Sequence, residues 1–458
     1  MDIKDFSGKS VLVMGLGKFG GGVDSAAFAA KAGARVTVTD TAGKEALKEA
    51  IEKLSCFDIN YHLGDHISSD FDGTGDTDII IVNPAVPPEN EFLRAAEAAG
   101  KKITSQIEIF FELCPAGIVG ITGANGKSTT TALTAHLLSE TVDPSRKVWL
   151  GGNIGNRPLL EIVDQIAEND IVVLEISSFQ AEQLARTKKA PHISLITNLT
   201  PNHLDRHGTF AEYCAAKEYL FKYQDKDEDL PAVSIFNAED AVTRGLFEKY
   251  SSESGRICRA YRAADVPEEL ANVFGLAGKM NLSNLGGALA VADYFEIDRS
   301  KLSKAVSSFK ALPNRLELVA EIDGVKWYDD SIATTPDSAI AALEAFDAPR
   351  IIIAGGYDKK LPFDKFAASI AINAKAAILI GQTAEVIEEE IRKAGKGNMK
   401  VEIAGSMEKA AAAAAEIAES GDVVLMSPAC ASYDMFENYR QRGEVFAAAV
   451  KGMGGKTN

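Results

Sequence analysis

Cysteines are few in this chain of 458 residues, and they lie far apart. There are five, at positions 56, 114, 214, 258 and 430, with no Cys-x-x-Cys pair among them. An odd number of scattered cysteines in a large chain argues against a disulfide framework and against a structural zinc site. Long apolar runs are also missing, since none approaches the ~20 residues of a membrane span. The first residues lack the charged-then-apolar order of a signal peptide. We therefore expect a cytoplasmic protein without membrane insertion.

Positively charged residues are also fewer than negatively charged ones. The chain has 48 Lys and Arg against 65 Asp and Glu, a formal net charge of −17. Such a balance does not favour non-specific binding to nucleic acid, and we expect no nucleic-acid partner. An anionic substrate would need a local pocket of Lys and Arg. The length exceeds what one hydrophobic core supports and predicts roughly three domains.

The most informative segment is a glycine-rich stretch between a predicted strand and a predicted helix. Gly123-Ala-Asn-Gly-Lys-Ser128 follows the apolar run 116–119 and precedes the helical pattern 132–138. A glycine turn at this junction directs backbone N–H groups and the positive end of the helix dipole at one point, which suits phosphate. Lys127 would reach the outer phosphates, and the Ser128 and Thr129 hydroxyls could hold magnesium. The sequence thus predicts binding of a nucleoside triphosphate.

A second glycine pattern lies near the N-terminus. The apolar strand 10–14 leads into glycines at 15, 17 and 20, then an alanine-rich helix through Ala32, and the strand 35–39 ends at Asp40. This order is the dinucleotide-binding fingerprint. The fingerprint indicates only that a phosphate binds at a helix N-terminus and that Asp40 binds a hydroxyl group. A nicotinamide-dependent dehydrogenase and a protein that binds a UDP-sugar both satisfy it.

Further apolar runs predict the remaining strands. The runs 170–176 and 192–198 are typical of central parallel strands. Four more, 326–329, 350–355, 376–381 and 423–427, indicate a third α/β unit after a linker at 312–314. We predict an α/β protein of three domains: a Rossmann-like domain at 1–109, a central parallel-sheet domain with the phosphate loop at 110–312, and a Rossmann-like domain at 313–458.

Polar residues at the ends of the central strands are candidates for a metal site. Glu175 ends one apolar strand, and a buried carboxylate there is costly unless a cation pairs with it. In the loop 198–207 we favour His203 as a ligand because its loop should lie beside the end of Glu175's strand. We expect His207 to be a packed residue. Lys217 lies among small residues on a predicted helix, and this pattern alone predicts a surface lysine.

Taken together, these motifs resemble the ATP-dependent Mur ligases of peptidoglycan synthesis. The resemblance rests on the phosphate loop, Glu175, the loop 198–207 and Lys217, and it continues through Asn281-x-x-Asn284, Asn314-Arg315 and Asp329-Asp330-Ser331, so it covers almost the whole chain. Residues 174–180 and 427–443 are similar to the glutamate-adding branch of that family.

The resemblance implies an activity. ATP would convert the carboxylate of UDP-N-acetylmuramoyl-L-alanine to an acyl phosphate, and the amine of glutamate would then attack it. An acyl phosphate must be shielded from water, which favours closure of the third domain over the second. The expected partners are these small molecules alone, and the chain is expected to be a monomer.

The resemblance also implies roles for individual residues. The phosphate loop for ATP would comprise Thr122, Gly123, Ala124, Asn125, Gly126, Lys127, Ser128 and Thr129. The remaining ATP contacts would be Asn281 and Asn284 near adenine, Arg315 at the γ-phosphate and Asp329 at the ribose. Two magnesium ions would be held by Ser128, Glu175, His203 and Lys217. Lys217 would be carbamylated by carbon dioxide, which overrides its interpretation as a surface lysine. The catalytic set would be Lys127, Glu175, His203, Lys217 and Arg315. The UDP-substrate would contact Lys18, Phe19, Asp40, Thr41, Asn83 and Asn153. Glutamate would contact Thr334, Lys359, Ser432 and Tyr439.

Three positions depart from the family pattern. Met280 and Asn202 replace a usual histidine and aspartate, and Ile332 replaces a usual lysine. The loop with Ile332 is similar to that of a branch that adds L-glutamate. We expect D-glutamate, because Thr334, Lys359 and Ser432 match the D-adding pattern. The alternatives are an L-glutamate ligase, a dehydrogenase that leaves the phosphate loop and Lys217 unexplained, and a catalytically silent binding relative.

Overall fold

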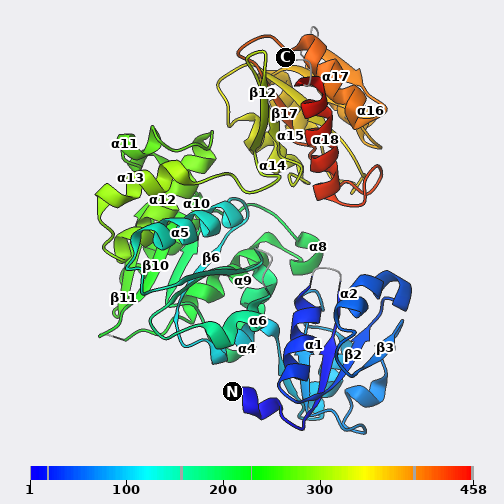
Figure 1. Ribbon diagram of the computed structural model, residues 1–458, viewed down its shortest axis with the longest axis vertical. Coiled ribbons are helices and arrows are strands. Elements are labelled where there is room, and N and C mark those ends of the chain that lie inside the picture. Colours follow the sequence, from blue (N-terminus) through cyan, green and yellow to red (C-terminus); the bar gives the residue numbers. More distant parts are fainter. Residues whose placement is uncertain (1, 18–19, 155–157, 228, 396–398, 455–458) are drawn as a thin grey trace. The chain divides into compact units, whose positions relative to one another are not determined.

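The computed structural model describes residues 2–17, 20–154, 158–227, 229–395 and 399–454. The chain forms three β-sheets, each covered by helices, and divides into two compact units. The N-terminal unit comprises Met1–Arg262 with Gly286–Lys301, and the C-terminal unit comprises Ala263–Leu285 with Leu302–Asn458. The first and central sheets belong to the N-terminal unit, and the third sheet belongs to the C-terminal unit (Figure 1).

The first sheet has five parallel strands. Their spatial order is β3 (Ile59–Leu63), β2 (Arg35–Asp40), β1 (Ser10–Met14), β4 (Ile79–Val82) and β5 (Lys102–Thr104). The helices of this part are α1 (Gly21–Lys31), α2 (Lys48–Lys53), α3 (Glu91–Ala98) and α4 (Gln106–Leu113). Side chains of β1 alternate between the two faces: Leu12 and Met14 belong to the apolar cluster with α3, whereas Val11 and Val13 belong to the cluster with α1. The strand order reverses between β1 and β4, the place where Rossmann-like sheets bind ligands.

The central sheet has six parallel strands. Their order is β11 (Arg256–Tyr261), β10 (Ala232–Asn237), β9 (Ile193–Ile196), β6 (Gly117–Thr122), β8 (Ile171–Glu175) and β7 (Val148–Gly152). One face packs with α5 (Lys127–Thr141) and with the second half of α12 (Lys279–Tyr294). The other face packs with α7 (Ser178–Thr187), α9 (Phe210–Lys222) and α10 (Ala241–Tyr250). Two short helices, α6 (Leu159–Ile162) and α8 (Leu204–His207), complete this part.

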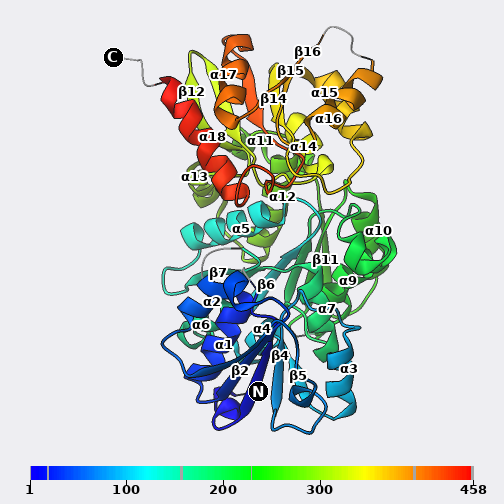
Figure 2. The ribbon, with the colours of Figure 1, turned by 90° about the vertical axis from the view of Figure 1, so that its right-hand side faces the viewer.

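The third sheet is mixed. Strand β12 (Glu317–Ile322) runs antiparallel to β13 (Val325–Asp329), and β17 (Val423–Met426), β14 (Arg350–Ala354), β15 (Ala374–Leu379) and β16 (Lys400–Ile403) follow in parallel. Helices α14 (Pro336–Leu343), α15 (Asp364–Asn373) and α16 (Ala384–Lys393) cover one face. Helices α17 (Met407–Ile417) and α18 (Tyr439–Gly454) cover the other (Figure 2). The remaining helices of the chain are α11 (Glu268–Ala271) and α13 (Arg299–Ser308).

The described residues also form five short 3₁₀ helices. They are η1 (Ile3–Phe6), η2 (Lys44–Leu47), η3 (Ser68–Asp70), η4 (Val163–Gln165) and η5 (Ala263–Asp265). No helix in the described part of the chain is long and apolar enough to cross a membrane.

The structure confirms the predicted fold class. Each predicted strand is present, and the alanine run at 410–415 lies within α17, where Ala410 and Ala414 are fully buried. Seven strands were not predicted, namely β3, β5, β7, β10, β11, β12 and β16, and neither was the antiparallel pairing of β12. The domain boundaries at 109 and 312 stay predictions.

Candidate active site

The predicted phosphate loop lies between β6 and α5. Gly123 has φ +145°, and a Cβ there would lie 1.9 Å from the hydroxyl oxygen of Thr197. Gly126 is left-handed with φ 80° and is the N-cap of α5. The loop is tied to the end of β9, because Asn125 N–H donates to Asn198 Oδ1 at 2.9 Å and Asn198 Nδ2 donates to Asn125 O at 2.9 Å. Only glycine can therefore occupy position 123, and the amide of Asn198 fixes the loop's shape.

The N-terminus of α5 presents the groups that suit phosphate. Lys127 is the first residue of this fifteen-residue helix, and its Nζ donates to Ala124 O at 2.8 Å. Ser128 and Thr129 are buried in the same first turn. The backbone N–H groups and the helix dipole at such a terminus favour an anion. The order of strand, glycine-rich loop and helix is therefore the predicted one.

Two buried ionisable groups lie next to this loop. Glu175, at the end of β8, is 2% exposed, and its Oε1 accepts a hydrogen bond from Asn153 Nδ2 at 3.2 Å. Within the described residues its Oε2 has no hydrogen-bond partner. Lys217 on α9 is 1% exposed, and its Nζ donates to Thr122 Oγ1 at 3.2 Å and lies 5.0 Å from the ring centroid of Tyr213. The interpretation of Lys217 as a surface lysine is wrong, because α9 packs this side chain against the end of β6.

The surroundings of Lys217 favour its neutral form. Burial holds the pKa of Lys217 well below its ordinary value of 10.5, and the positive charge of Lys127 lowers it further. The carboxylate of Glu175 acts in the opposite direction and is the smaller influence. Loss of the proton would free the electron pair that an amine needs to act as a nucleophile.

The two candidate histidines differ in their environments. His207 is buried, its Nε2 lies 2.9 Å from Ser178 Oγ, and its ring stacks on Phe179 at 5.3 Å. His207 is thus the packed residue that we predicted. His203 begins α8 with φ 52°, and its ring lies 5.3 Å from that of Phe179. Across the described ranges no three His, Cys, Asp or Glu side chains are grouped to hold a metal ion, so the metal role of His203 stays a prediction.

Asp40 holds the glycine turn of the first sheet. Its Oδ2 accepts hydrogen bonds from Leu16 N–H at 2.8 Å and Gly17 N–H at 3.1 Å, and its Oδ1 accepts one from Ala42 N–H at 2.8 Å. The residue that the fingerprint assigns to a sugar hydroxyl is therefore also the anchor of the turn that would receive phosphate.

The other predicted UDP contacts are divided between two places. Asn83 follows β4 and Thr41 follows β2, so both lie at the carboxyl ends of strands that flank β1. Asn153 instead follows β7 in the central sheet, where it bonds to Glu175. Lys18 and Phe19 lie outside the described residues.

Four predicted ATP contacts lie in the C-terminal unit. Asp329 is buried at the end of β13, and its carboxylate accepts hydrogen bonds from Asn314 Nδ2 and Ser331 N–H, each at 2.8 Å. Burial raises the pKa of Asp329 despite these bonds. Arg315 follows Asn314 in the segment that leads into β12.

The remaining pair lies on one turn of α12. Asn284 Nδ2 donates to Asn281 Oδ1 at 3.1 Å, and Asn281 Nδ2 donates to Ala277 O at 2.8 Å. Both asparagines are buried. The spacing Asn-x-x-Asn therefore places the two amides side by side, as helical geometry requires.

The predicted glutamate contacts gather at one edge of the third sheet. Thr334 follows β13, Ser432 follows β17 and Lys359 follows β14, and these three strands are neighbours in the sheet. Their carboxyl ends meet at the same edge. Ser432 is buried, Lys359 is exposed, and Tyr439 begins α18. The sheet thus brings together residues that are up to about one hundred positions apart in the sequence.

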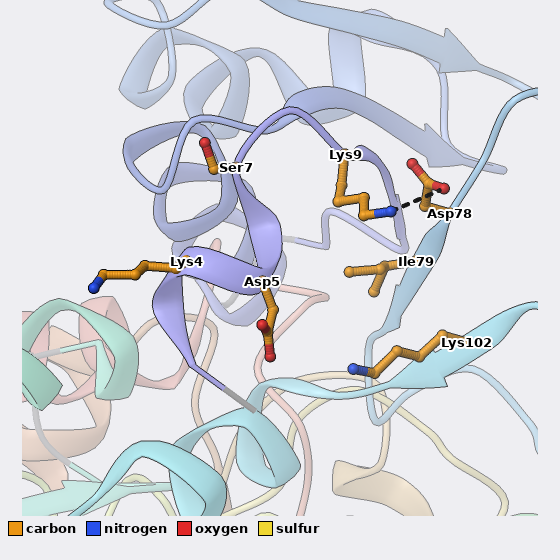
Figure 3. Close-up of a pocket in the computed structure, with 7 residues that line it drawn as sticks. All are labelled: Lys4, Asp5, Ser7, Lys9, Asp78, Ile79 and Lys102. Carbon is orange, nitrogen blue, oxygen red and sulfur yellow. Dashed lines mark ion pairs between the residues drawn. The ribbon is translucent and has the colours of Figure 1, made fainter.

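A pocket of about 490 Å³ lies at the opposite end of the first sheet. Lys4, Lys9 and Lys102 line it together with Asp5 and Asp78 (Figure 3). Lys9 pairs with Asp78 at 3.7 Å. Because Lys9 and Asp78 precede β1 and β4, this pocket is remote from Asp40 and belongs to no predicted site.

The three sheets and the loop at 123–128 define a phosphate-loop nucleotide-binding protein of the α/β class. Family models match most of the chain: "Mur ligase MurD-like, N-terminal domain" at residues 9–105, "Mur ligase middle domain" at 121–292 and "Mur ligase, glutamate ligase domain" at 314–430. The chain belongs to the Mur ligase family.

Individual relatives agree along nearly the whole length. The UDP-N-acetylmuramoylalanine–D-glutamate ligase of Acetivibrio thermocellus is 37% identical, with 98% of this chain and 97% of the relative covered. The enzyme of that name from Roseiflexus is 38% identical, with 97% and 99% covered. Among solved structures, a MurF ligase from Thermotoga maritima in complex with ADP has a TM-score of 0.57 at 18% identity, with 99% and 97% covered. That structural likeness supports the fold.

Proposed function

We propose that this chain is an ATP-dependent ligase that joins D-glutamate to UDP-N-acetylmuramoyl-L-alanine in the synthesis of peptidoglycan precursors. The relatives of that name, 37–38% identical over almost the full length, support the substrate assignment. The observation in this chain that carries the proposal is the buried Lys217. Its Nζ donates a hydrogen bond to Thr122, the residue before Gly123 of the phosphate loop, and it is influenced by the charge of Glu175.

The chemistry has two steps. A carboxylate does not condense with an amine at neutral pH, so the alanyl carboxylate oxygen first attacks the γ-phosphorus of ATP, and the bond to the departing ADP breaks. The amine of glutamate then attacks the acyl carbon of the resulting acyl phosphate. The intermediate expels inorganic phosphate, and the nitrogen loses a proton. Positioning and neutralisation of charge are what such a transfer requires of the protein.

The phosphate loop supplies the first part of that charge. Backbone N–H groups at the start of α5 and the ammonium of Lys127 would hold the phosphates of ATP. Asn125 and Asn198 keep the loop in shape through their paired amide bonds.

Glu175 and Lys217 fit the magnesium that the family resemblance implies. Burial of a carboxylate with one unpartnered oxygen is costly unless a cation lies beside it, and Glu175 Oε2 is such an oxygen within the described residues. The neutral amine of Lys217 would add to carbon dioxide and lose a proton, which replaces a cation by a carbamate anion. Ser128, Glu175, His203 and this carbamate would then hold two magnesium ions, which when bound neutralise phosphate charge.

The first sheet would bind the UDP moiety rather than NAD. Asp40, Thr41 and Asn83 lie at the carboxyl ends of the strands on either side of β1, where a doubly wound sheet binds nucleotides. A dehydrogenase would use this segment but would leave Lys127 and Lys217 without a role.

The loop after β13 bears on the recognition of the amino acid. Ile332 N–H donates to Asn314 O at 3.3 Å, and its apolar side chain offers no cation to a carboxylate. Lys359 would therefore bind a glutamate carboxylate, with hydroxyl groups from Thr334 and Ser432 beside it. This set matches the D-adding pattern, which is why we propose D-glutamate.

One assay tests the proposal. Purified protein is given ATP, magnesium and UDP-N-acetylmuramoyl-L-alanine with either D- or L-glutamate, and phosphate release is followed. We expect release that depends on the UDP-substrate and is faster with D-glutamate. Faster turnover of L-glutamate would assign the chain to the L-adding alternative, and no amino-acid-dependent release would refute the ligase.

A further inference from the structure

Arg442 is a fully buried arginine whose described partners are backbone carbonyl oxygens. It lies on α18 and is 0% exposed. Its Nη2 donates to Ser331 O at 2.8 Å and to Cys430 O at 2.9 Å, and its Nη1 donates to Ala431 O at 3.1 Å. Burying a guanidinium is costly, and these charge-assisted bonds offset part of that cost.

The three carbonyl groups belong to loops that carry proposed glutamate contacts. Ser331 precedes Thr334 in the loop after β13, and Cys430 and Ala431 directly precede Ser432 in the loop after β17. The guanidinium of Arg442 therefore forms hydrogen bonds with two loops, through residues that are about one hundred positions apart in the chain.

The loop after β14, which carries Lys359, also lies beside these carbonyl groups. Tyr357 N–H donates to Ala431 O at 2.9 Å, so this carbonyl also accepts a bond from the loop after β14. A Cβ at Gly356 would lie 3.2 Å from Arg442 Nη1 and 2.4 Å from Ala431 O, so the backbone of this loop passes directly against the guanidinium. Arg442 thus bonds to two of the three loops, and the third bonds to the same carbonyl of Ala431 and passes close to the guanidinium.

The sequence at α18 allows this close approach. Gly443 follows Arg442, and a Cβ there would lie 2.4 Å from Asp329 Oδ2 and 2.7 Å from Ser331 Oγ. Glycine lets the helix lie against the end of β13, which brings the guanidinium within reach of the carbonyl groups. The planar fork of arginine then fixes the directions of several acceptors at once, which the single ammonium of lysine does not do.

We propose that Arg442 is the positioning residue of the glutamate site: it sets the mutual placement of Thr334 and Ser432 by holding the backbones of their two loops, and that of Lys359 through Ala431 O, which also binds the loop after β14. This inference rests on the proposed function. It assigns Arg442 an effect on amino-acid binding that does not require contact with glutamate.

The test compares two buried arginines. Arg442→Lys and Arg442→Ala are measured beside Arg256→Met as a matched control. Arg256 also has a fully buried side chain, and it bonds to Phe221 O at 2.8 Å and Gln224 Oε1 at 2.6 Å, but it lies in the central sheet of the N-terminal unit. Folding is checked by circular dichroism, and KM is measured for D-glutamate and for ATP.

We expect folded Arg442→Lys to raise the KM for D-glutamate by at least about tenfold, which corresponds to the loss of about one charge-assisted bond, with the KM for ATP within about twofold. Added guanidinium chloride at non-denaturing concentration should lower the glutamate KM of Arg442→Ala. Arg256→Met should reduce stability and leave the glutamate KM unchanged.

An unchanged glutamate KM in folded Arg442→Lys would overturn the proposal, and so would an equal rise for ATP and glutamate. Loss of folding in Arg442→Ala alone leaves Arg442→Lys to decide. The wild-type enzyme separates the two claims: if it does not turn over D-glutamate, the proposed function fails, whereas normal wild-type turnover with unaltered variants refutes only the role of Arg442.

Discussion

Replacing Asp330 with asparagine should remove a pH dependence from the stability of the C-terminal unit. Asp330 is buried directly after β13, where its Oδ2 accepts a hydrogen bond from Ser427 Oγ at 2.7 Å and its Oδ1 accepts one from Leu316 N–H at 3.3 Å. Burial raises the pKa of Asp330 to about 7, and the hydrogen bonds and the charge of Arg315 oppose the rise only in part. The folded unit therefore prefers the protonated acid.

The sign and size of the effect follow from linkage. A group whose folded pKa is raised stabilises the fold fully below its unfolded pKa, here the ordinary 3.8, and this contribution is lost as the pH rises through about 7. A difference of roughly three pH units at ~1.36 kcal/mol each corresponds to about 4 kcal/mol in total. Of this, about 2–3 kcal/mol should be lost between about pH 5 and about pH 8.5. Asparagine is neutral throughout, so it should lose none.

The two tryptophans of the chain make the assay specific. Trp149→Phe leaves Trp327, which is 2% exposed in β13 close to Asp330, as the sole tryptophan reporter. Urea unfolding followed by its fluorescence, at both pH values, gives the free energy of unfolding. Asp347→Asn, at an exposed position between α14 and β14, is the control and should retain the parent's pH dependence. If Asp330→Asn loses as much stability as its parent between these pH values, the buried acid is not the cause.

Four further predictions concern the site. Lys127→Ala should lower kcat by at least about 10²–10³-fold with the fold intact, because it removes charge from the transferring phosphoryl group; near wild-type turnover would remove ATP chemistry from this loop. Lys217→Ala should be nearly inactive and partly restored by small carboxylic acids that replace the carbamate; full activity without additive would contradict the assignment. Lys359→Ala should raise the glutamate KM by about one to two orders of magnitude, from the loss of a charge-assisted bond of roughly 1.5–3 kcal/mol, and an equal rise in the KM for ATP would contradict a specific role. Asp40→Ala should weaken the UDP-substrate because it frees the turn at Leu16 and Gly17, and titration of the wild type with NADH should show no binding; tight NADH binding would favour the dehydrogenase.

The strands that form long apolar runs could be predicted, because a strand buried on both faces is apolar at nearly every position. Strand β8 is buried at every position, so it reads as one apolar run ending in Glu175. Strand β12 lies at an edge, is only partly buried and contains two glutamates, so no apolar run marks it. Its antiparallel pairing with β13 depends on a turn at Asp323-Gly324 that the apolar pattern does not specify.

Without the family resemblance, the site could be predicted only where its residues are close in sequence. The phosphate loop is one continuous stretch, so its geometry followed from the order of strand, glycines and helix. The burial of Lys217 depends on Thr122, 95 residues away, and the loop's anchor Asn198 lies 73 residues from Asn125. Arg442 belonged to a matching motif, but its three carbonyl partners are visible only once the third sheet has formed.

The fate of one oxygen atom tests the central claim most directly. UDP-N-acetylmuramoyl-L-alanine labelled with oxygen-18 in its alanyl carboxylate is turned over with ATP and D-glutamate, and the phosphate and the product are analysed by mass spectrometry. Ligation through an acyl phosphate predicts that each phosphate released carries one labelled oxygen and that the amide product retains the other. Phosphate without label, or release of phosphate without an amide product, would contradict the account.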